Sequence, residues 1–393
     1  MFFKALVAAA VVTGAFAQDP SPPDALEGLT IYAPDNSFQA SFMRRGATLT
    51  NFWVPDKSGN YRDIILGFDD HTHYVSDDLG HPYFGPVVGR YANRIRNGTF
   101  TIPTSKWATG PGDVYHVPLN ENNLTDTLHG GLTGYDRRNW TLTAATNNSL
   151  TFNLTDVSGN QGFPGTVNAG IHYELASNLT FKINMYATSD EDTPILMSCH
   201  HYWNLEAYQE SQNLTGHMAM IKSPKVTLDN GYEIPMGTYI DVAGTPLDFN
   251  TAKSIGEAIP QTAGKDYCGT NCTGIDNCFI YDKPASNSST SSSDDESLFS
   301  IWSVNSGIKM DVTTNQAALQ MYTCNGLYNA STPIPRKASQ GGPSEHYPNY
   351  SCVVLEQENI IDAINNPEYG ADEIYGPGRD YVWEAVYKFS ASG

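Results

Sequence analysis

The chain has 393 residues, of which 40% are hydrophobic, 11% are aromatic and only 16% are charged. This composition is typical of a globular protein and argues against a disordered chain or a coiled coil. With 42 acidic and 22 basic side chains, the net charge of -20 would repel phosphate backbones and anionic headgroups, so we expect no nucleic acid and no membrane as a partner.

The first residues have the pattern of a secretory leader. Lys4 precedes an apolar run over residues 5–17 that is too short to cross a bilayer, and the run ends in Ala15-Phe16-Ala17. Small residues at this spacing are what signal peptidase cuts. We therefore expect residues 1–17 to be removed as a signal peptide, which leaves Gln18 as the N-terminus of a secreted, extracellular protein.

Alternation with a period of two dominates the rest of the chain. In residues 179–186 the large apolar side chains fall on one face, as a half-buried strand requires. Many strands joined by Gly, Asn, Asp and Pro turns, without the spacing of β-α-β units, predict an all-β fold with a large antiparallel β-sandwich or barrel. Further strands are predicted at residues 151–155, 171–175, 226–228, 299–302 and 381–389, and a short helix at residues 254–259.

The chain shows no internal repeat and no second composition regime, so we expect residues 18–393 to form a single domain. One low-complexity stretch, residues 284–297, is rich in Ser and Asp. It cannot bury enough apolar surface to offset its ordering entropy, so we expect a surface loop here and not a domain boundary.

Cysteines and glycan acceptors agree with an extracellular protein. In an oxidising compartment the six cysteines would tend to form disulfide bonds. The closely spaced Cys268, Cys272 and Cys278 predict at least one disulfide bond within a loop. No Cys-x-x-Cys spacing or nearby His pair supports a zinc site. Asn-x-Ser/Thr acceptors occur at Asn97, Asn123, Asn139, Asn147, Asn153, Asn178, Asn213, Asn271, Asn287, Asn329 and Asn349.

Three polar motifs in the first half of the chain could carry chemistry. Gly89-Arg90-Tyr91-Ala92-Asn93-Arg94-Ile95 offers two guanidinium forks, which suit vicinal hydroxyls or carboxylates, although structural ion pairs would explain them equally well. In Leu128-His129-Gly130-Gly131 the glycines would let a ligand approach the backbone, or form a simple turn. In His200-His201-Tyr202-Trp203-Asn204-Leu205 only one histidine can enter a given pocket, because successive strand side chains point to opposite faces.

Carboxylates and amides follow in the last third of the chain. Gly274-Ile275-Asp276-Asn277 and Gln320-Met321-Tyr322-Thr323 supply a carboxylate, an amide and an aromatic ring. Val353-Val354-Leu355-Glu356 ends an apolar strand in a carboxylate. Because a buried carboxylate is costly unless it is paired or functional, Glu356 is a candidate catalytic residue.

Taken in order, these motifs resemble the aldose 1-epimerase (galactose mutarotase) family. The resemblance also includes Tyr83-Phe84-Gly85, Pro235-Met236-Gly237 and the Gly-Thr-Pro-Leu-Asp-Phe segment of residues 244–249, and it extends from about Tyr32 to Phe389. It implies a galactose mutarotase-like supersandwich with an open cleft on one sheet and no cofactor. The implied activity interconverts the α and β anomers of free aldoses of the glucose or galactose type. We expect a small-molecule sugar as substrate and a monomer or a weak dimer.

The resemblance also assigns roles to individual residues. It implies that Glu356 is the general base for the C1 hydroxyl and that His200 is the general acid for the ring oxygen. Such chemistry asks for one ionised carboxylate and one protonated imidazole. We therefore expect the carboxylate to raise the pKa of His200 and the imidazolium to lower the pKa of Glu356. The sugar hydroxyls would be held by Asn93, Arg94, His129, Asp276 and Gln320.

The chain departs from the family pattern at Cys199, His201, Cys324, Glu358 and Ile361. Glu358 stands where the family usually has Gln. If the strand continues, Glu358 shares a face with Glu356, and a second negative charge there would raise the pKa of the base. Cys199 and Cys324 could form a disulfide bond beside the pocket, and two inert buried thiols are the alternative.

Other functions fit parts of the pattern. A non-catalytic carbohydrate-binding protein could share the fold, since sites and not folds define function, but the intact His200 and Glu356 speak against it. A glycosidase could use Glu356 and Asp276 as paired carboxylates. His71-x-His73 raises the hypothesis of a metal-dependent isomerase, but such pairs usually occur in polar loops without any ion, so we expect no metal.

Overall fold

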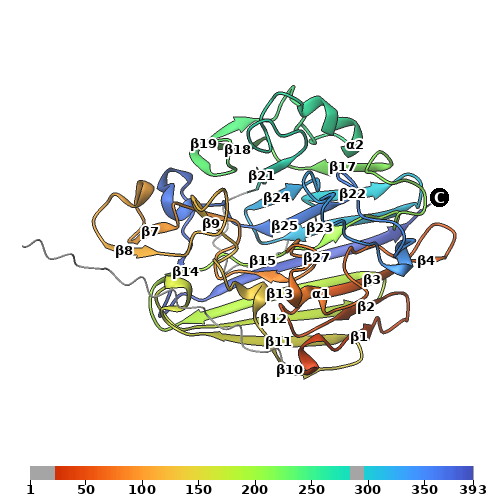
Figure 1. The fold of residues 1–393 in the computed structure, drawn as a ribbon, viewed down its shortest axis with the longest axis horizontal. Helices are drawn as coiled ribbons and strands as arrows, with labels where there is room; N and C mark the ends of the chain where they lie inside the picture. Colours follow the sequence, from red (N-terminus) through yellow and green to blue (C-terminus); the bar gives the residue numbers. More distant parts are fainter. Residues whose placement is uncertain (1–22, 284–295, 393) are drawn as a thin grey trace, which may run out of the picture.

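The computed structural model describes residues 23–283 and 296–392. The predicted signal peptide at residues 1–17 and residues 284–295 of the low-complexity stretch lie outside the described residues. Strands dominate the described chain, and helices are restricted to short turns between them (Figure 1).

The largest sheet is antiparallel and has nine strands, in the order β10-β11-β12-β13-β27-β23-β22-β17-β20. The last strand of the chain, β27, lies in the middle of this sheet, between β13 and β23. In Figure 1 the long strands β11, β12 and β13 run side by side. The bounds are β10 Thr141–Ala145, β11 Ser149–Asp156, β12 Val167–Ala176, β13 Thr180–Ser189, β17 His217–Ile221, β20 Lys253–Ser254, β22 Phe299–Ser303, β23 Ile308–Thr314 and β27 Tyr381–Ala391.

A second antiparallel sheet has six strands, in the order β16-β25-β24-β21-β18-β19. Its central strands carry several of the candidate site residues, and their register places Gln320 opposite Glu356. The bounds are β16 Tyr202–Trp203, β18 Lys225–Asp229, β19 Pro235–Asp241, β21 Asp276–Ile280, β24 Ala318–Tyr322 and β25 Val353–Glu358.

Smaller sheets complete the fold. A four-stranded sheet contains β1 Leu29–Tyr32, β2 Gln39–Phe42, β3 Leu49–Pro55 and β4 Tyr61–Asp63. Four strand pairs combine β5 Val87–Val88 with β15 Ser198–Cys199, β6 Arg94–Arg96 with β9 Asp126–Leu128, β7 Thr99–Ile102 with β8 Asp113–His116, and β14 Thr193–Pro194 with β26 Ile374–Tyr375.

A shared hydrophobic core lies between the sheets. Phe52 of β3 packs against Phe389 of β27, with ring centroids 5.1 Å apart, and against Trp203 of β16 at 5.8 Å. Leu319 and Leu355 of the six-stranded sheet belong to the same buried cluster. Residues from three sheets thus fill one interior, which confirms the predicted β-sandwich. The sheets remain open, since the strand orders begin and end on different strands, so the barrel alternative is wrong.

Local sequence explains the predicted elements. The strand predicted at residues 179–186 forms most of β13, whose alternating Phe181, Ile183 and Met185 are buried. The predicted helix is α2, Ile255–Ala258, and Ser254 caps it by accepting a hydrogen bond from the backbone N–H of Glu257 at 3.2 Å. The other helical turns are α1 His73–Ser76, η1 Pro23–Leu26, η2 Lys106–Ala108, η3 Tyr135–Arg137, η4 Asn160–Gly162, η5 Ile259–Thr262, η6 Ala338–Gln340, η7 Ala363–Asn365 and η8 Pro367–Tyr369. None of the helices in the described part of the chain is long and apolar enough to cross a bilayer.

Candidate active site

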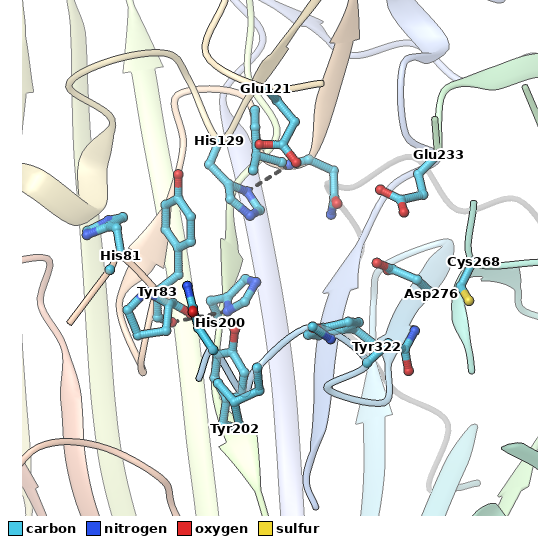
Figure 2. A pocket seen from close by; sticks show the side chains of 18 of the residues that line it. His81, Tyr83, Glu121, His129, His200, Tyr202, Glu233, Cys268, Asp276 and Tyr322 are labelled. Atoms are coloured by element: carbon cyan, nitrogen blue, oxygen red, sulfur yellow. Dashed lines mark hydrogen bonds between the residues drawn. The ribbon is translucent and has the colours of Figure 1, made fainter. Parts of the chain in front are cut away.

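A cleft of about 590 Å³ opens over the strands that carry the candidate residues. Its walls include His129, His200, Asp276 and Glu356, which come from distant parts of the sequence. Figure 2 shows His129 and His200 on one side of the cleft and Asp276 with Glu233 on the other. The fold therefore brings together side chains that are each more than 70 positions from the next in the sequence.

The structure places the predicted catalytic pair in direct proximity. His200 follows β15 and Glu356 lies in β25, and His200 Nε2 is 3.7 Å from Glu356 Oε1. The Nδ1–H of His200 donates to the carbonyl oxygen of Tyr83 at 3.1 Å, which leaves Nε2 to face Glu356. Among the described residues Glu356 Oε2 has no hydrogen-bond partner. Glu356 Oε2 is thus a buried oxygen without a partner in the described chain, and His200 and Glu356 both line the cleft.

His201 points away from this pair, as the alternation of strand side chains requires. It is 1% exposed, and its ring packs edge-on against Trp203 with centroids 5.8 Å apart. His201 is absent from the cleft lining. The prediction that only one of the two histidines enters the pocket is therefore confirmed.

The pKa shifts expected for the pair have the wrong direction. Burial lowers the pKa of His200 to about 4, against a smaller opposing effect of the Tyr83 carbonyl. Burial also raises the pKa of Glu356 to about 8, and the charge of Asp276 adds to this shift while Asn93 and Arg94 oppose it. Desolvation penalises both charged forms more strongly than their mutual attraction favours them. At neutral pH the pair still holds one proton, but that proton resides on Glu356.

Glu358 is the second carboxyl group of β25, which continues two residues beyond the predicted end at Glu356. Its side chain is fully buried, and its Oε1 accepts a hydrogen bond from Asn93 Nδ2 at 2.8 Å. Burial and the neighbouring Glu356 raise the pKa of Glu358 well above its ordinary value. Burial therefore favours the protonated form of Glu358.

His129 presents a hydrogen-bond donor to the cleft. Its Nδ1 accepts from the backbone N–H of Asn93 at 3.1 Å, so the neutral ring carries its proton on Nε2. Burial, together with His200 and Arg94, lowers the pKa of His129 well below its usual value and keeps the ring neutral. Its ring contacts the ring of His200 edge-on at 5.1 Å.

The glycines after His129 serve the protein's own packing. A Cβ on Gly130 would lie 2.2 Å from the carbonyl oxygen of Gly89, and the φ of Gly130 is +86°. Only glycine fits this close approach and this left-handed conformation. The expectation that the missing side chain makes room for a ligand is therefore wrong for Gly130.

Arg94 lines the cleft and is held in place by acidic neighbours. It forms an ion pair with Glu233, and its guanidinium lies 3.6 Å from Glu121 and 3.8 Å from Asp126. Although burial works in the opposite direction, these charges raise the pKa of Arg94, chiefly through Glu233. Arg94 thus stays charged and is fixed in position.

Asp276 begins β21 and lines the cleft, whereas Gln320 does not. Gln320 is 3% exposed and donates from Nε2 to Asp276 Oδ1 at 2.5 Å, so it supports Asp276 from behind. Burial raises the pKa of Asp276 to about 8, with Glu233 adding to the shift and Arg94 opposing it. Gln320, which the resemblance places at the sugar, is thus absent from the cleft lining and contacts Asp276 instead.

One group among the described residues has ligand atoms close enough to hold a metal ion: His129, His200 and Glu356, within 4.8 Å of one another. The donor set fits a metal poorly. Because His129 Nδ1 already accepts a hydrogen bond, its Nε2 carries a proton and has no lone pair to offer. His71 and His73 belong to no such group, and their Nδ1 atoms contact Leu26 and Asp78.

The described residues form two disulfide bonds, and one of them lines the cleft. Cys268 bonds to Cys272, which confirms the predicted bridge within the crowded trio, and Cys324 bonds to Cys352. The proposed Cys199–Cys324 bridge is therefore wrong, because Cys324 has a different partner. Cys199 and Cys278 are free and buried thiols.

Several lining residues were not predicted. Three of them, Tyr83, Tyr202 and Tyr322, belong to the sequence motifs described above, so these motifs could have identified them as cleft residues. Glu121 and Glu233 have no such signal, since loops bring them to Arg94. His81 also lines the cleft and contacts Asp77 and Asp136 at 2.9 and 2.8 Å.

The chain also resembles known proteins in its sequence. The family model described as Aldose 1-epimerase matches residues 29–388. The "Probable aldose 1-epimerase" of Arthroderma benhamiae is 41% identical over 390 residues, which cover 91% of this chain and 85% of that protein. The "Aldose 1-epimerase" of Escherichia coli is 30% identical over 353 residues, which cover 89% of this chain and 92% of that protein.

Solved structures share the fold. The GalM/aldose epimerase homologue from C. elegans superposes with a TM-score of 0.77 at 25% identity and covers 93% of this chain and 99% of its own. Galactose 1-epimerase from Lactobacillus acidophilus has a TM-score of 0.70 at 19% identity, with 94% and 100% covered, and this likeness concerns the fold alone. The galactose mutarotase-like sandwich expected from the sequence is thereby confirmed.

Proposed function

The chain belongs to the aldose 1-epimerase family and is an isomerase, and we propose that it interconverts the α and β anomers of a free aldose of the glucose or galactose type. The observation that carries this proposal is the distance of 3.7 Å between His200 Nε2 and Glu356 Oε1 at a cleft large enough for a hexose. Both oxygens that exchange protons in anomerisation are bonded to the same sugar carbon, so an acid and a base this close can reach them together.

In the proposed reaction Glu356 takes the proton of the C1 hydroxyl and His200 delivers a proton to the ring oxygen. The bond between C1 and the ring oxygen breaks, and C1 becomes an aldehyde carbon. Rotation about the C1–C2 bond presents the other face of the aldehyde, and the two proton transfers run in reverse to close the ring. The proton count of the pair is restored at the end of each turnover.

The proton needed for the first step is already present in the pair. Burial favours its residence on Glu356, because it raises the pKa of this carboxyl group to about 8. Its shift to His200 Nε2 gives the carboxylate and imidazolium without any exchange with solvent. Hydrogen bonding by Asn93 and the charge of Arg94 both favour the ionised form of Glu356 and so assist this shift.

The remaining polar groups would hold the sugar. His129 Nε2–H is a donor, Asp276 is an acceptor when ionised and a donor when protonated, and the guanidinium of Arg94 offers a fork of donors. Asn93 also lines the cleft, and its amide is oriented by Glu358. These complementary groups surround the catalytic pair on two sides, which suits a ring with several hydroxyl groups.

Polarimetry tests the proposal. Freshly dissolved α-D-glucose and α-D-galactose should lose their initial optical rotation faster with the enzyme than without it. Glu356→Gln should lower the rate by about 100-fold to 10,000-fold, as expected when a general base is removed. Glu174→Gln is the matched control, because Glu174 lies in β12 outside the cleft and pairs only with Lys182. An inactive wild type that still binds galactose would support a carbohydrate-binding protein, and release of sugar from a nitrophenyl galactoside would support a glycosidase.

We further propose that the protein acts outside the cell as a monomer or a weak dimer. Its two disulfide bonds and the exposed sequon residues Asn147, Asn178 and Asn213 support an extracellular location. The test is mass spectrometry of the protein from its source, which should begin at Gln18 and carry N-linked glycans. Light scattering after gel filtration should give the mass of one chain at low concentration.

A further inference from the structure

The Cys268–Cys272 disulfide bond is part of the cleft wall. Both cysteines line the cleft, and they close a short loop that ends four residues before Asp276. In Figure 2 Cys268 lies beside Asp276 on the wall opposite the two histidines. The bridge is thus adjacent to a sugar-binding carboxyl group and on the other side of the cleft from His200.

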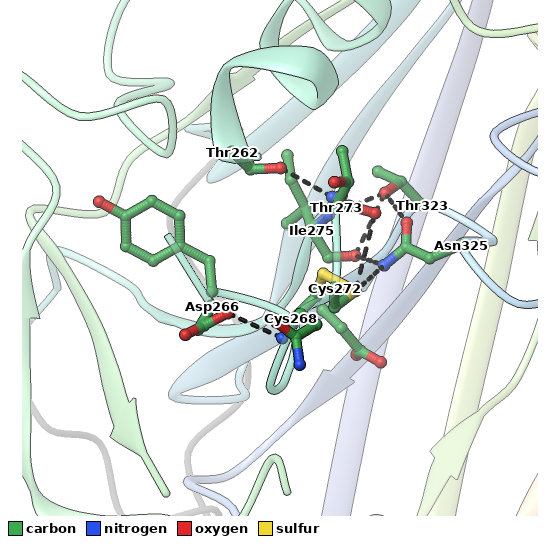
Figure 3. The surroundings of a disulfide bond; sticks show 12 residues. Thr262, Asp266, Cys268, Cys272, Thr273, Ile275, Thr323 and Asn325 are labelled. Atoms are coloured by element: carbon green, nitrogen blue, oxygen red, sulfur yellow. Dashed lines mark hydrogen bonds between the residues drawn. A yellow bond between two sulfur atoms is a disulfide. The ribbon is translucent and has the colours of Figure 1, made fainter. Parts of the chain in front are cut away.

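Hydrogen bonds connect this loop to the rest of the wall (Figure 3). The N–H of Gly274 donates to Thr262 Oγ1 at 2.7 Å, and the N–H of Ile275 donates to Thr323 Oγ1 at 2.9 Å. Asn325 Nδ2 donates to the carbonyl oxygen of Ile275 at 3.3 Å and lies 3.6 Å from Cys272 Sγ. Asn325 therefore connects the sulfur of the bridge directly to the backbone next to Asp276.

Asn325 is itself held by the second disulfide bond. It follows Cys324, which is bonded to Cys352 one residue before β25. Thr323 Oγ1 donates to Asn325 Oδ1 at 2.6 Å and fixes the orientation of the amide. The Cys324–Cys352 disulfide bond thus holds Asn325 in place, and the side chain of Asn325 contacts the Cys268–Cys272 loop.

The two disulfide bonds differ in exposure. Cys324 and Cys352 are fully buried, whereas Cys272 is half-buried at the cleft surface and its partner Cys268 is 3% exposed. A thiol reductant must reach a sulfur atom to attack it, so access favours Cys272 over both cysteines of the other bridge. A sugar in the cleft would cover this sulfur.

We propose that the Cys268–Cys272 disulfide bond positions the sugar-binding wall, and that its reversible reduction by a dithiol weakens sugar binding while leaving the acid–base pair able to react. This inference rests on the proposed function for its kinetic test. The carbonyl oxygen of Tyr83 orients His200, and Glu356 is positioned by its place in β25, so both are held by groups outside the Cys268–Cys272 loop. The expected effect therefore falls on KM and not on kcat.

The redox step is ordinary thiol–disulfide exchange. A thiolate of the dithiol attacks Cys272 Sγ, the Cys268–Cys272 bond breaks, and Cys268 leaves as a thiolate that takes up a proton. The second thiol of the reductant then displaces Cys272 from the mixed disulfide. The protein gains two thiols and the reductant becomes a cyclic disulfide, so electrons balance. A disulfide of the surroundings reverses the reaction, because it accepts the two electrons and becomes two thiols while the Cys268–Cys272 bond re-forms.

The first experiment measures anomerisation of galactose by oxidised wild type, by wild type treated with dithiothreitol under native conditions, and by the double variant Cys268→Ser/Cys272→Ser. We expect KM to rise roughly threefold to tenfold in the last two, the cost of re-ordering one or two side chains on binding, with kcat within about twofold. The double variant should not respond further to dithiothreitol. Circular dichroism melting of each sample separates a local change from loss of the fold.

The second experiment needs no catalysis. Thiols formed by dithiothreitol are alkylated at timed intervals and located by peptide mass spectrometry. Cys268 and Cys272 should be labelled before Cys324 and Cys352, and saturating galactose should slow their labelling. Equal KM values in the double variant and the oxidised wild type, or earlier labelling of Cys324 and Cys352, would overturn the inference. If the oxidised wild type is inactive, the proposed function is refuted. If galactose also fails to slow the labelling of Cys268 and Cys272, the placement of sugar at this wall is refuted as well.

Discussion

Replacement of Glu358 by Gln tests the electrostatics of the site in the folded protein. Glu358 is fully buried beside Glu356, and its Oε1 accepts a hydrogen bond from Asn93. Its Oε2 has no hydrogen-bond partner among the described residues. Gln keeps the shape of a protonated carboxylic acid, with a carbonyl oxygen to accept from Asn93 and a donor at the second position. The substitution therefore removes the titration of the group and little else.

The size of the effect follows from proton linkage. Burial and Glu356 raise the pKa of Glu358 well above its ordinary value of 4.5. Above pH 4.5 the unfolded chain releases a proton that the folded protein keeps, so this group destabilises the fold increasingly as the pH rises. While the folded protein keeps this proton, the free energy of unfolding falls by about 1.4 kcal/mol per pH unit above pH 4.5. Glu358→Gln should remove this slope, so the variant's gain in stability over wild type should grow from pH 4 to pH 7.

Urea unfolding followed by tryptophan fluorescence at pH 4, 5.5 and 7 measures the difference. The stability of wild type should fall toward pH 7 more steeply than that of Glu358→Gln, and polarimetry at pH 7 should give the variant a kcat within about twofold of wild type. Glu174→Gln provides the control, since a surface pair such as Glu174 with Lys182 contributes less than about 1 kcal/mol. Parallel stability curves for wild type and Glu358→Gln would refute the reasoning, because Glu358 would then titrate normally in the folded protein.

Three further outcomes are expected from steady-state polarimetry. His200→Gln should lower kcat by about 100-fold or more with little change in KM, because the general acid is lost while the sugar contacts remain; a large rise in KM alone would contradict its role. The rate should be highest between the pKa of His200 at about 4 and that of Glu356 at about 8, because only there does the pair hold a single proton, and a flat profile from pH 4 to 9 would count against the assignment. Asp276→Asn should raise KM about tenfold. It should also move the alkaline limb of the pH–rate profile to lower pH, because the charge of Asp276 raises the pKa of Glu356. An alkaline limb that does not move would show that the two carboxyl groups do not interact.

Much of the fold could be predicted because its signals are local. Residues 179–186 alternate in polarity, and a sequence with that period can bury one face only as a strand, which became β13. Ser254 followed by Glu257 marked the start of α2 for an equally local reason. The order of the strands within the nine-stranded sheet has no such signal, since it depends on contacts between segments far apart.

The site was predictable where residue types and their order carry the chemistry. His200 and Glu356 could be paired through the family resemblance that their motifs carry. The partners of Arg94 could not be predicted, because Glu121 and Glu233 reach it from separate loops. The protonation of the pair depends on how deeply both groups are buried. Sequence reasoning weighed only their attraction for each other, so it missed that desolvation reverses both pKa shifts.

The central place of β27 has a consequence for the synthesis of this protein. Residues 381–391 separate β13 from β23, so the hydrogen-bonding edges of both strands remain exposed until the end of the chain has left the ribosome. During that interval the two halves of the sheet are open to pairing with other chains. Truncations that remove β27 should therefore yield insoluble protein, although the catalytic pair, the cleft residues and both disulfide bonds all precede it in the sequence.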